Sequence, residues 1–152
     1  MRLLIQNVIK ANVEIDKKIV GEISHGFCVF VGFTDGDNEE IVRKMADKLV
    51  SLRLFNDENG KTNLSLKDVN GEILSVSQFT LYADVSHGRR PSFINAMKGE
   101  QSTKLYDYFN TYLSSLGYKI KTGVFGADMK VNIINDGPFT IFLDSKELIK
   151  WR

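Results

Sequence analysis

The pair Gly137-Pro138 interrupts a strand-like pattern that runs from Met129 to Leu143. Proline cannot donate a ladder hydrogen bond, and X-Pro is the peptide bond for which the cis form costs least, about 0.5–1 kcal/mol. Glycine lacks the Cβ that keeps another molecule away from the main chain. The pair could therefore present a rigid backbone surface, carbonyls included, to a ligand. A hairpin turn is the alternative, and Gly-Pro by itself favours it.

A second segment, residues 75–81 (SVSQFTL), places three polar side chains around one aromatic ring. In a regular strand Ser77 and Phe79 face one side while Gln78 and Thr80 face the other. All four can address one ligand only if the strand bends or ends there. In the alternative interpretation Phe79 belongs to the core and Thr80 is an ordinary strand residue.

Together, residues 75–81 and 135–140 (NDGPFT) resemble the two signature motifs of the D-aminoacyl-tRNA deacylases. The likeness covers essentially the whole chain. Further matching stretches are residues 4–8 (LIQNV), 90–93 (RPSF), 105–109 (LYDYF) and 122–129 (TGVFGADM). One departure is Asn7, where many members of this family carry a basic residue, so any contact made by that residue is expected to differ here.

The resemblance implies hydrolysis of an ester between an amino acid and the ribose of a transfer RNA's terminal adenosine. Such a reaction needs a positioned water, donors for the developing oxyanion and a fixed acyl group. Ser77, Gln78 and Thr80 would supply hydroxyl and amide groups, and backbone N–H groups beside them could form the oxyanion hole. Phe79 could stack on the adenine.

The resemblance also implies how chirality would be read. A cis peptide at Gly137-Pro138 would hold the α-amino group through main-chain carbonyls, so an L side chain would meet the backbone and a D side chain would point to open space. Glycine has no side chain, and glycyl-tRNA would also be accepted. Phe125 and Met129 are further candidates for lining the site, with a core position as the alternative.

Other catalytic machinery is missing from the sequence. His25 and His87 lie in turn-like settings, and no zinc pattern, phosphate loop or Gly-x-Ser-x-Gly motif is present. Asp128 and Asp136 could form a carboxylate pair, although Asp136 beside glycine is typical of a turn. We therefore expect no metal or organic cofactor. Without a general base, Thr80 is a poor nucleophile, and the neighbouring ribose hydroxyl could help to activate water instead.

Length and composition indicate the number of domains, the source of any RNA contact and the cellular compartment. A length of 152 residues predicts a single domain over residues 1–152. The net charge is only +1, so any RNA contact must come from local charge. The single cysteine, Cys28, lies in an apolar run and is expected to be buried, which fits a reducing compartment. No signal peptide or membrane span is visible, so a cytoplasmic protein is expected. Candidate phosphate contacts are Arg89, Arg90, Lys119, Lys121 and Lys130.

Periodicity predicts the elements that must position these residues. Strands are expected in residues 2–33, 73–81, 118–125, 129–134 and 139–143. One helix should begin near Asp37 and Glu40 with an apolar stripe through Met45 and Leu49. A second should span about residues 102–116, bury a face that includes Leu116, and end at Gly117.

These elements predict an α+β domain with a mainly antiparallel sheet and two main helices. The resemblance adds a curved, barrel-like sheet and a twofold homodimer. A non-catalytic RNA- or nucleotide-binding β module with Phe79 as its stacking platform, or a structural dimerisation domain, are the competing interpretations. Turnover of D-aminoacyl-tRNA would indicate the esterase. Saturable binding without turnover would indicate the binding module, and neither would be seen for the structural domain.

Overall fold

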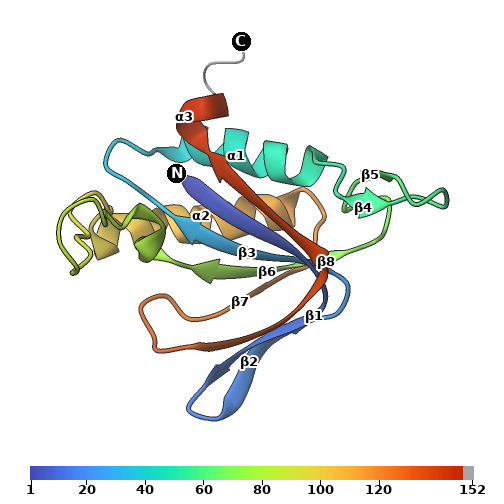
Figure 1. Ribbon diagram of the computed structural model, residues 1–152, viewed down its shortest axis with the longest axis horizontal. Helices are drawn as coiled ribbons and strands as arrows, with labels where there is room; N and C mark the ends of the chain where they lie inside the picture. The colour runs from blue at the N-terminus through green and yellow to red at the C-terminus, as the bar shows by residue number, and fades with distance from the viewer. Residues whose placement is uncertain (149–152) are drawn as a thin grey trace.

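One long strand organises the main sheet of this protein, for which a computed structural model describes residues 1–148 (Figure 1). The six strands of this sheet are β1 (Arg2–Ile15), β2 (Lys18–Ile23), β3 (Gly26–Gly32), β6 (Glu72–Ser77), β7 (Ile120–Thr122) and β8 (Lys130–Asp144). β1 pairs antiparallel with β8 along one edge and with β3 and β2 along the other. This confirms the expected dominance of antiparallel pairing.

Two pairings, β3 with β6 and β6 with β7, are parallel, which the strand pattern did not reveal. Parallel neighbours require a crossover connection, and the two main helices lie in these two connections. A small separate hairpin, β4 (Phe55–Asn56) with β5 (Thr62–Leu64), follows the first helix. The sheet curls until β2 approaches β7. A Cβ on Gly21 would lie 2.6 Å from the carbonyl oxygen of Thr122. The expected barrel-like curvature is therefore confirmed.

The first helix, α1 (Glu39–Ser51), begins one residue later than the sequence suggested. Its N-cap is Asn38, whose side-chain oxygen accepts from the backbone N–H of Ile41 at 3.0 Å. Asp37 instead accepts from the backbone of Thr34 and from the N-terminal ammonium of Met1, each at 2.8 Å. The predicted apolar stripe is confirmed, since Val42, Met45, Ala46 and Leu49 are all buried.

The second helix, α2 (Gly99–Ser115), starts three residues before its expected position. It buries Tyr106, Phe109 and Leu113 against the sheet and α1. The expectation for Leu116 was wrong. The helix ends before it, Gly117 adopts φ +95°, and Leu116 is 43% exposed because the chain turns away from the core there. A short α3 (Ser145–Leu148) was not predicted.

The core divides into two clusters on opposite faces of the sheet. Leu3, Ile5 and Val29 meet α1 and α2 on one face. Val8 and Cys28 belong to the second cluster, inside the curl. Cys28 is fully buried, and this burial raises the pKa of its thiol to about 12, which confirms its expected role as a small apolar side chain. Within residues 1–148 no helix is long and apolar enough to cross a membrane.

β8 is one continuous strand that carries Gly137-Pro138 on a bulge. Gln6 pairs with Thr140 and Val8 with Asn135, so Asn7 alone lies opposite residues 136–139. The Gly137-Pro138 bond is cis, and the backbone N–H of Phe139 donates to Asn135 Oδ1 at 3.0 Å. Both halves of β8 run in the same direction along β1. The hairpin alternative is therefore wrong, and the two strands expected from sequence are one.

Candidate functional site

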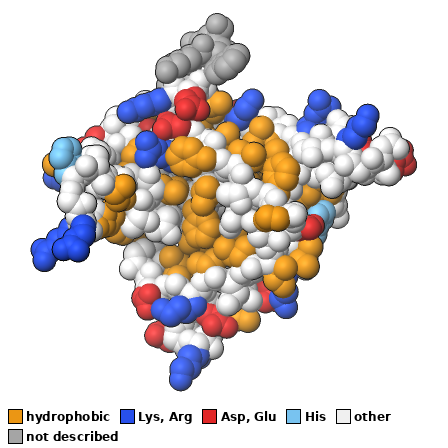
Figure 2. Space-filling model, in the orientation of Figure 1, with side chains coloured by type: hydrophobic (Ala, Val, Ile, Leu, Met, Phe, Trp, Pro, Cys, Tyr) orange, Lys and Arg blue, Asp and Glu red, His pale blue; other side chains and the backbone are white. Residues whose placement is uncertain are grey.

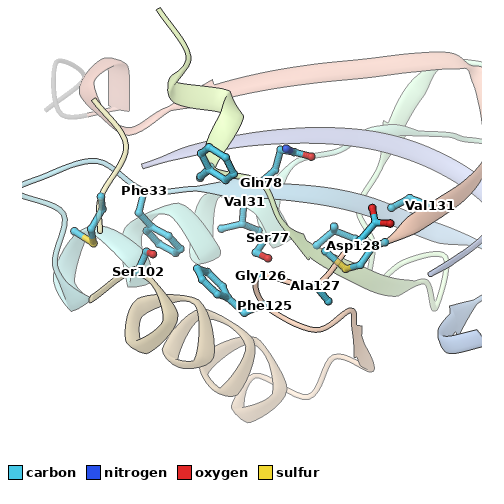
Figure 3. Close-up of a pocket in the computed structure, with 15 residues that line it drawn as sticks. Val31, Phe33, Ser77, Gln78, Ser102, Phe125, Gly126, Ala127, Asp128 and Val131 are labelled. Atoms are coloured by element: carbon cyan, nitrogen blue, oxygen red, sulfur yellow. The ribbon is translucent and has the colours of Figure 1, made fainter. Parts of the chain in front are cut away.

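A pocket of about 290 Å³ opens at the carboxyl end of β6 (Figure 3). Five of the residues proposed from sequence line it, and they come from two separate segments of the chain. Ser77, Gln78 and Phe79 stand at the end of β6, whereas Phe125 and Met129 lie in the connection between β7 and β8. The fold thus brings together residues about fifty positions apart.

The first motif changes conformation inside this pocket. β6 ends at Ser77, and after Gln78 the chain enters a short 3₁₀ helix, η1 (Phe79–Tyr82). Gln78 N donates to Val31 O at 2.7 Å. Gly32 permits this approach, because a Cβ there would stand 2.9 Å from Gln78 O. The strand therefore ends within the motif, and this is one of the two ways, bending or ending, in which its alternating side chains could address one ligand.

The side chains of the motif take up distinct positions. Ser77 is directed toward Phe125, and Gln78 is directed away from it (Figure 3). Phe79 is 55% exposed and Thr80 is exposed, so the core-and-strand interpretation of these two residues is wrong. Thr80 does not line the pocket, but its hydroxyl accepts a hydrogen bond from Gln78 Nε2.

Hydrogen-bond donors remain free at the start of η1. Among the described residues, no acceptor is bonded to the backbone N–H of Phe79 or Thr80. Two adjacent free N–H groups can stabilise an anionic oxygen. His25 and His87 are exposed and do not line this pocket. The site thus offers donors for a developing oxyanion and no histidine base.

Arg2 fixes the far end of η1, a role that the sequence did not suggest. Its Nη1 donates to Leu81 O at 2.7 Å, its Nε meets Asp144 at 3.0 Å, and its guanidinium lies 4.4 Å from the Tyr82 ring centroid. Partial burial acts to raise the pKa of Asp144, but hydrogen bonds from Lys146 N and from Arg2 outweigh it, and the pKa is lowered. The charged pair therefore persists at neutral pH.

Phe125 and Met129 both line the pocket and pack on the core. Phe125 lies 5.9 Å from Tyr106, centroid to centroid, and the Tyr106 hydroxyl donates to Ser75 O at 2.8 Å. Met129 packs against the cluster inside the curl. Both residues are partly exposed. The two interpretations left open by the sequence are thus compatible, because the rim of the core is also the wall of the pocket.

The two aspartates do not form a carboxylate pair. Asp128 lines the pocket and bonds to Lys130 at 3.0 Å, whereas Asp136 lines a different cavity. Within residues 1–148, no group of three His, Cys, Asp or Glu side chains is placed to hold a metal ion.

The second motif lies away from this pocket. Ser77 is level with Val31, Leu3 and Leu143 across three strand pairings, whereas Gly137 lies opposite Asn7. Strand spacing and rise put Gly137 on the order of 20 Å from Ser77 along the sheet. Gly137 lines a separate cavity of about 230 Å³ together with Asn7, and Pro138 is exposed.

Asn7 occupies the space beneath the bulge. It is 6% exposed, and its Nδ2 donates to Leu54 O at 2.6 Å while its Oδ1 has no hydrogen-bond partner among residues 1–148. The bulge itself lies within an apolar surface. Figure 2 shows hydrophobic side chains gathered over β1 and β8, and Ile9, Ile134 and Phe142 are each about half exposed.

Comparison with known proteins gives one family. The family model described as D-Tyr-tRNA(Tyr) deacylase matches residues 4–144. A protein of Lactobacillus acidophilus named D-aminoacyl-tRNA deacylase is 56% identical over 144 residues, which is 95% of this chain and 99% of that protein. A protein of the same name from Listeria innocua is 53% identical over 150 residues, 99% of this chain and all of its own length.

Two solved structures share the fold. One, titled c-Myc DNA Unwinding Element Binding Protein, has a TM-score of 0.89 at 40% identity and covers 95% of this chain and 98% of its own. The other is titled as a probable eukaryotic D-amino acid tRNA deacylase, with a TM-score of 0.82 at 20% identity, covering 93% and 97%. The family model and the two bacterial relatives show that the chain belongs to the D-Tyr-tRNA(Tyr) deacylase family.

Proposed function

We propose that this protein hydrolyses the ester bond of D-aminoacyl-tRNA and releases the free D-amino acid and tRNA. The observation that carries the proposal is the pocket at the end of β6, where Ser77, Gln78 and Phe79 converge with Phe125 and Met129. Membership of the family and relatives named D-aminoacyl-tRNA deacylase support the same activity. Since translation uses aminoacyl-tRNA in the cytoplasm, we expect the protein to act there.

The chemistry follows from what the pocket offers. The free N–H groups of Phe79 and Thr80 would stabilise the oxyanion that forms when water attacks the ester carbonyl. The exposed ring of Phe79 would stack on the terminal adenine, and Ser77 would position the acyl group or the water. Thr80 accepts a hydrogen bond from Gln78 and orients that amide. The ribose hydroxyl beside the ester would assist the attacking water.

A twofold homodimer would complete the site. Within one chain the Gly137-Pro138 bulge and the pocket are on the order of 20 Å apart, as the strand register requires. The bulge interrupts a strand whose exposed side chains include Ile134 and Phe142, an apolar surface that favours contact with another protein surface. In an isologous dimer the same surface meets its own copy, and the bulge of one subunit could reach the pocket of the other.

In this arrangement Gly137-Pro138 would read chirality through its backbone. Main-chain carbonyls would hold the α-amino group of the substrate. The backbone would then exclude an L side chain, whereas a D side chain would point to open space. A pocket that only measures size discriminates by about 1–3 kcal/mol per methylene, so a backbone barrier is the stronger filter. Glycyl-tRNA, which has no side chain to exclude, would also be hydrolysed.

One assay tests the function directly. The same tRNA is charged with the D-amino acid, the L-amino acid or glycine, and release of the amino acid is followed with the purified protein. We expect rapid hydrolysis of the D and glycyl esters and slow hydrolysis of the L ester. Saturable binding of tRNA without turnover of any ester would instead identify a non-catalytic nucleic-acid-binding module.

A further inference from the structure

The loop between η1 and α2, residues 83–98, leaves the sheet beyond the end of β6 (Figure 1). Its base is tied. Asp84 and Ser92 exchange backbone hydrogen bonds of 2.8 and 2.9 Å, and Met97 N donates to Phe33 O at 3.0 Å. The Phe93 ring meets the Phe79 ring edge to face, with centroids 5.0 Å apart. This loop therefore extends the rim of the pocket, and we call it the rim loop.

The rim loop carries a surplus of positive charge. Arg89 and Arg90 are exposed, and neither has a hydrogen bond or ion pair within the described part of the chain. The loop has one carboxylate, Asp84, which accepts from the N–H and the hydroxyl of Ser86 at 2.9 and 2.5 Å. With Lys98 at its end, the loop holds three cations against that carboxylate. The net charge of the whole chain is only +1.

The other cations considered from sequence are placed differently. Lys130 is paired with Asp128 at 3.0 Å. Lys121 is level with Leu74, and Ile73 N bonds to Lys119 O, so both lie about 10–15 Å back along the sheet from Ser77. Of the five cations considered from sequence, Arg89 and Arg90 are the two that lie on the rim loop, and neither has a carboxylate partner in the described part of the chain.

We propose that the rim loop binds the single-stranded 3′ end of the tRNA. Phe79 and Phe93 are 55% and 39% exposed and present aromatic rings on which bases stack. Arg89 and Arg90 pair with phosphates upstream of the terminal adenosine, which is how cations beside aromatics hold single-stranded nucleic acid. This inference rests on the proposed function and assigns the part of the substrate that the pocket does not reach.

The test compares two double variants that lose the same charge. Arg89→Gln with Arg90→Gln removes the proposed contacts, and Lys119→Gln with Lys121→Gln removes two cations elsewhere. Each is assayed on D-aminoacyl-tRNA over a salt series and on D-aminoacyl-adenosine, which has no phosphate. We expect the arginine variant to raise KM for the tRNA roughly tenfold, and to reduce the slope of log KM against log salt by about 1.4, or 0.7 per phosphate. Its kinetics on the adenosine ester should match those of the lysine variant.

Two further variants separate charge from shape. Arg89→Lys with Arg90→Lys should keep most of the salt slope. Phe93→Ala should raise KM for tRNA about fivefold or more with the slope unchanged, because stacking is not ionic. An unchanged KM and slope in the arginine-to-glutamine variant would overturn the proposal, as would an equal loss in the lysine control.

Binding of uncharged tRNA, measured by fluorescence anisotropy, keeps this inference separate from the activity. If no ester is hydrolysed but the arginine variant still binds uncharged tRNA more weakly than the lysine variant, the rim loop is an RNA contact and the proposed enzyme is wrong. If esters are hydrolysed and both variants bind tRNA like the unchanged protein, the enzyme stands and the rim-loop contact is wrong.

Discussion

The two motifs that read as one site in the sequence occupy contrasting places in the fold. Residues 77–80 lie at a strand end, against Gly32 and beside a pocket that Phe125 and Met129 also line. The Gly137-Pro138 bulge lies on an exposed strand, near a different cavity and among half-exposed apolar side chains. The first region borders a pocket formed within one chain. The second has the character of a surface that acts on another molecule, which is why a second subunit enters the proposal.

The largest effect is expected from filling the bulge. Gly137 has φ +135°, and a Cβ there would lie 3.0 Å from the backbone nitrogen of Phe139. Gly137→Val should therefore lower kcat/KM for D-aminoacyl-tRNA by on the order of 100-fold or more, since it would displace the backbone that we propose positions the substrate. Gly60→Val is a matched control, because Gly60 also has positive φ (+74°) and, among the described residues, no atom lies within 4 Å of its Cβ position. Both substitutions strain the backbone and should lower thermal stability, but Gly60→Val should keep the activity.

Mixing two inactive variants tests whether the two regions cooperate across subunits. Ser77→Trp should block the pocket, and Gly137→Val should disable the bulge. If each site uses the pocket of one chain and the bulge of the other, co-refolded protein should recover about a quarter of the unmodified activity, through random pairing into dimers. No recovery in a mixture shown to contain mixed dimers would mean that each chain supplies its whole site.

Removing an aromatic side chain from each region should impair a different property of the protein. Phe79→Ala should weaken binding of the RNA terminus by about 1–3 kcal/mol, seen as a raised KM, with little change in Tm because the ring is 55% exposed. Phe142→Ala, on the strand that carries the bulge, removes a ring that is 49% exposed and should instead weaken self-association in sedimentation experiments. Unfolding of Phe79→Ala would show that this ring supports the core.

A smaller effect is expected at Thr80. Its hydroxyl accepts from Gln78, so Thr80→Val should cost no more than about tenfold in kcat by loosening that amide. Loss of an obligate nucleophile typically costs on the order of 10⁴-fold or more. A fall of that size, or an isolated acyl ester on Thr80, would reassign the residue as the nucleophile.

The smallest change is expected on metal removal. The described residues contain no cluster suited to a metal ion, so EDTA should leave deacylation unchanged in both kcat and KM. Activity that disappears with EDTA and returns with zinc or magnesium would show that a metal takes part in the reaction.

Local sequence signals accounted for much of the fold. The 3.6-residue spacing of Val42, Met45 and Leu49 predicted α1 correctly, because a helix with one apolar stripe must bury it. The N-cap residue of α1 was predicted less accurately. Asp37 and Asn38 are both good N-cap residues. Asp37 is engaged by the backbone N–H of Thr34 and by the N-terminal ammonium, and Asn38 takes the N-cap role. Leu116 continued the apolar pattern past the end of its helix, since periodicity does not report where a chain turns away from the core.

The sequence by itself determined the family and the residue types of both motifs. It also showed that the side chains of residues 77–80 could address one ligand only if their strand bent or ended there, because alternation in a strand is a local property of the chain. Tertiary structure decided the rest. The end of β6 at Ser77 depends on Gly32 in a neighbouring strand, and the role of Arg2 depends on Asp144 at the far end of the chain. Likewise, the Gly137-Pro138 motif could be recognised from a short stretch of sequence. Its distance from Ser77, however, follows from three strand registers that involve residues throughout the chain. Non-local pairing sets those registers, and no short segment contains them.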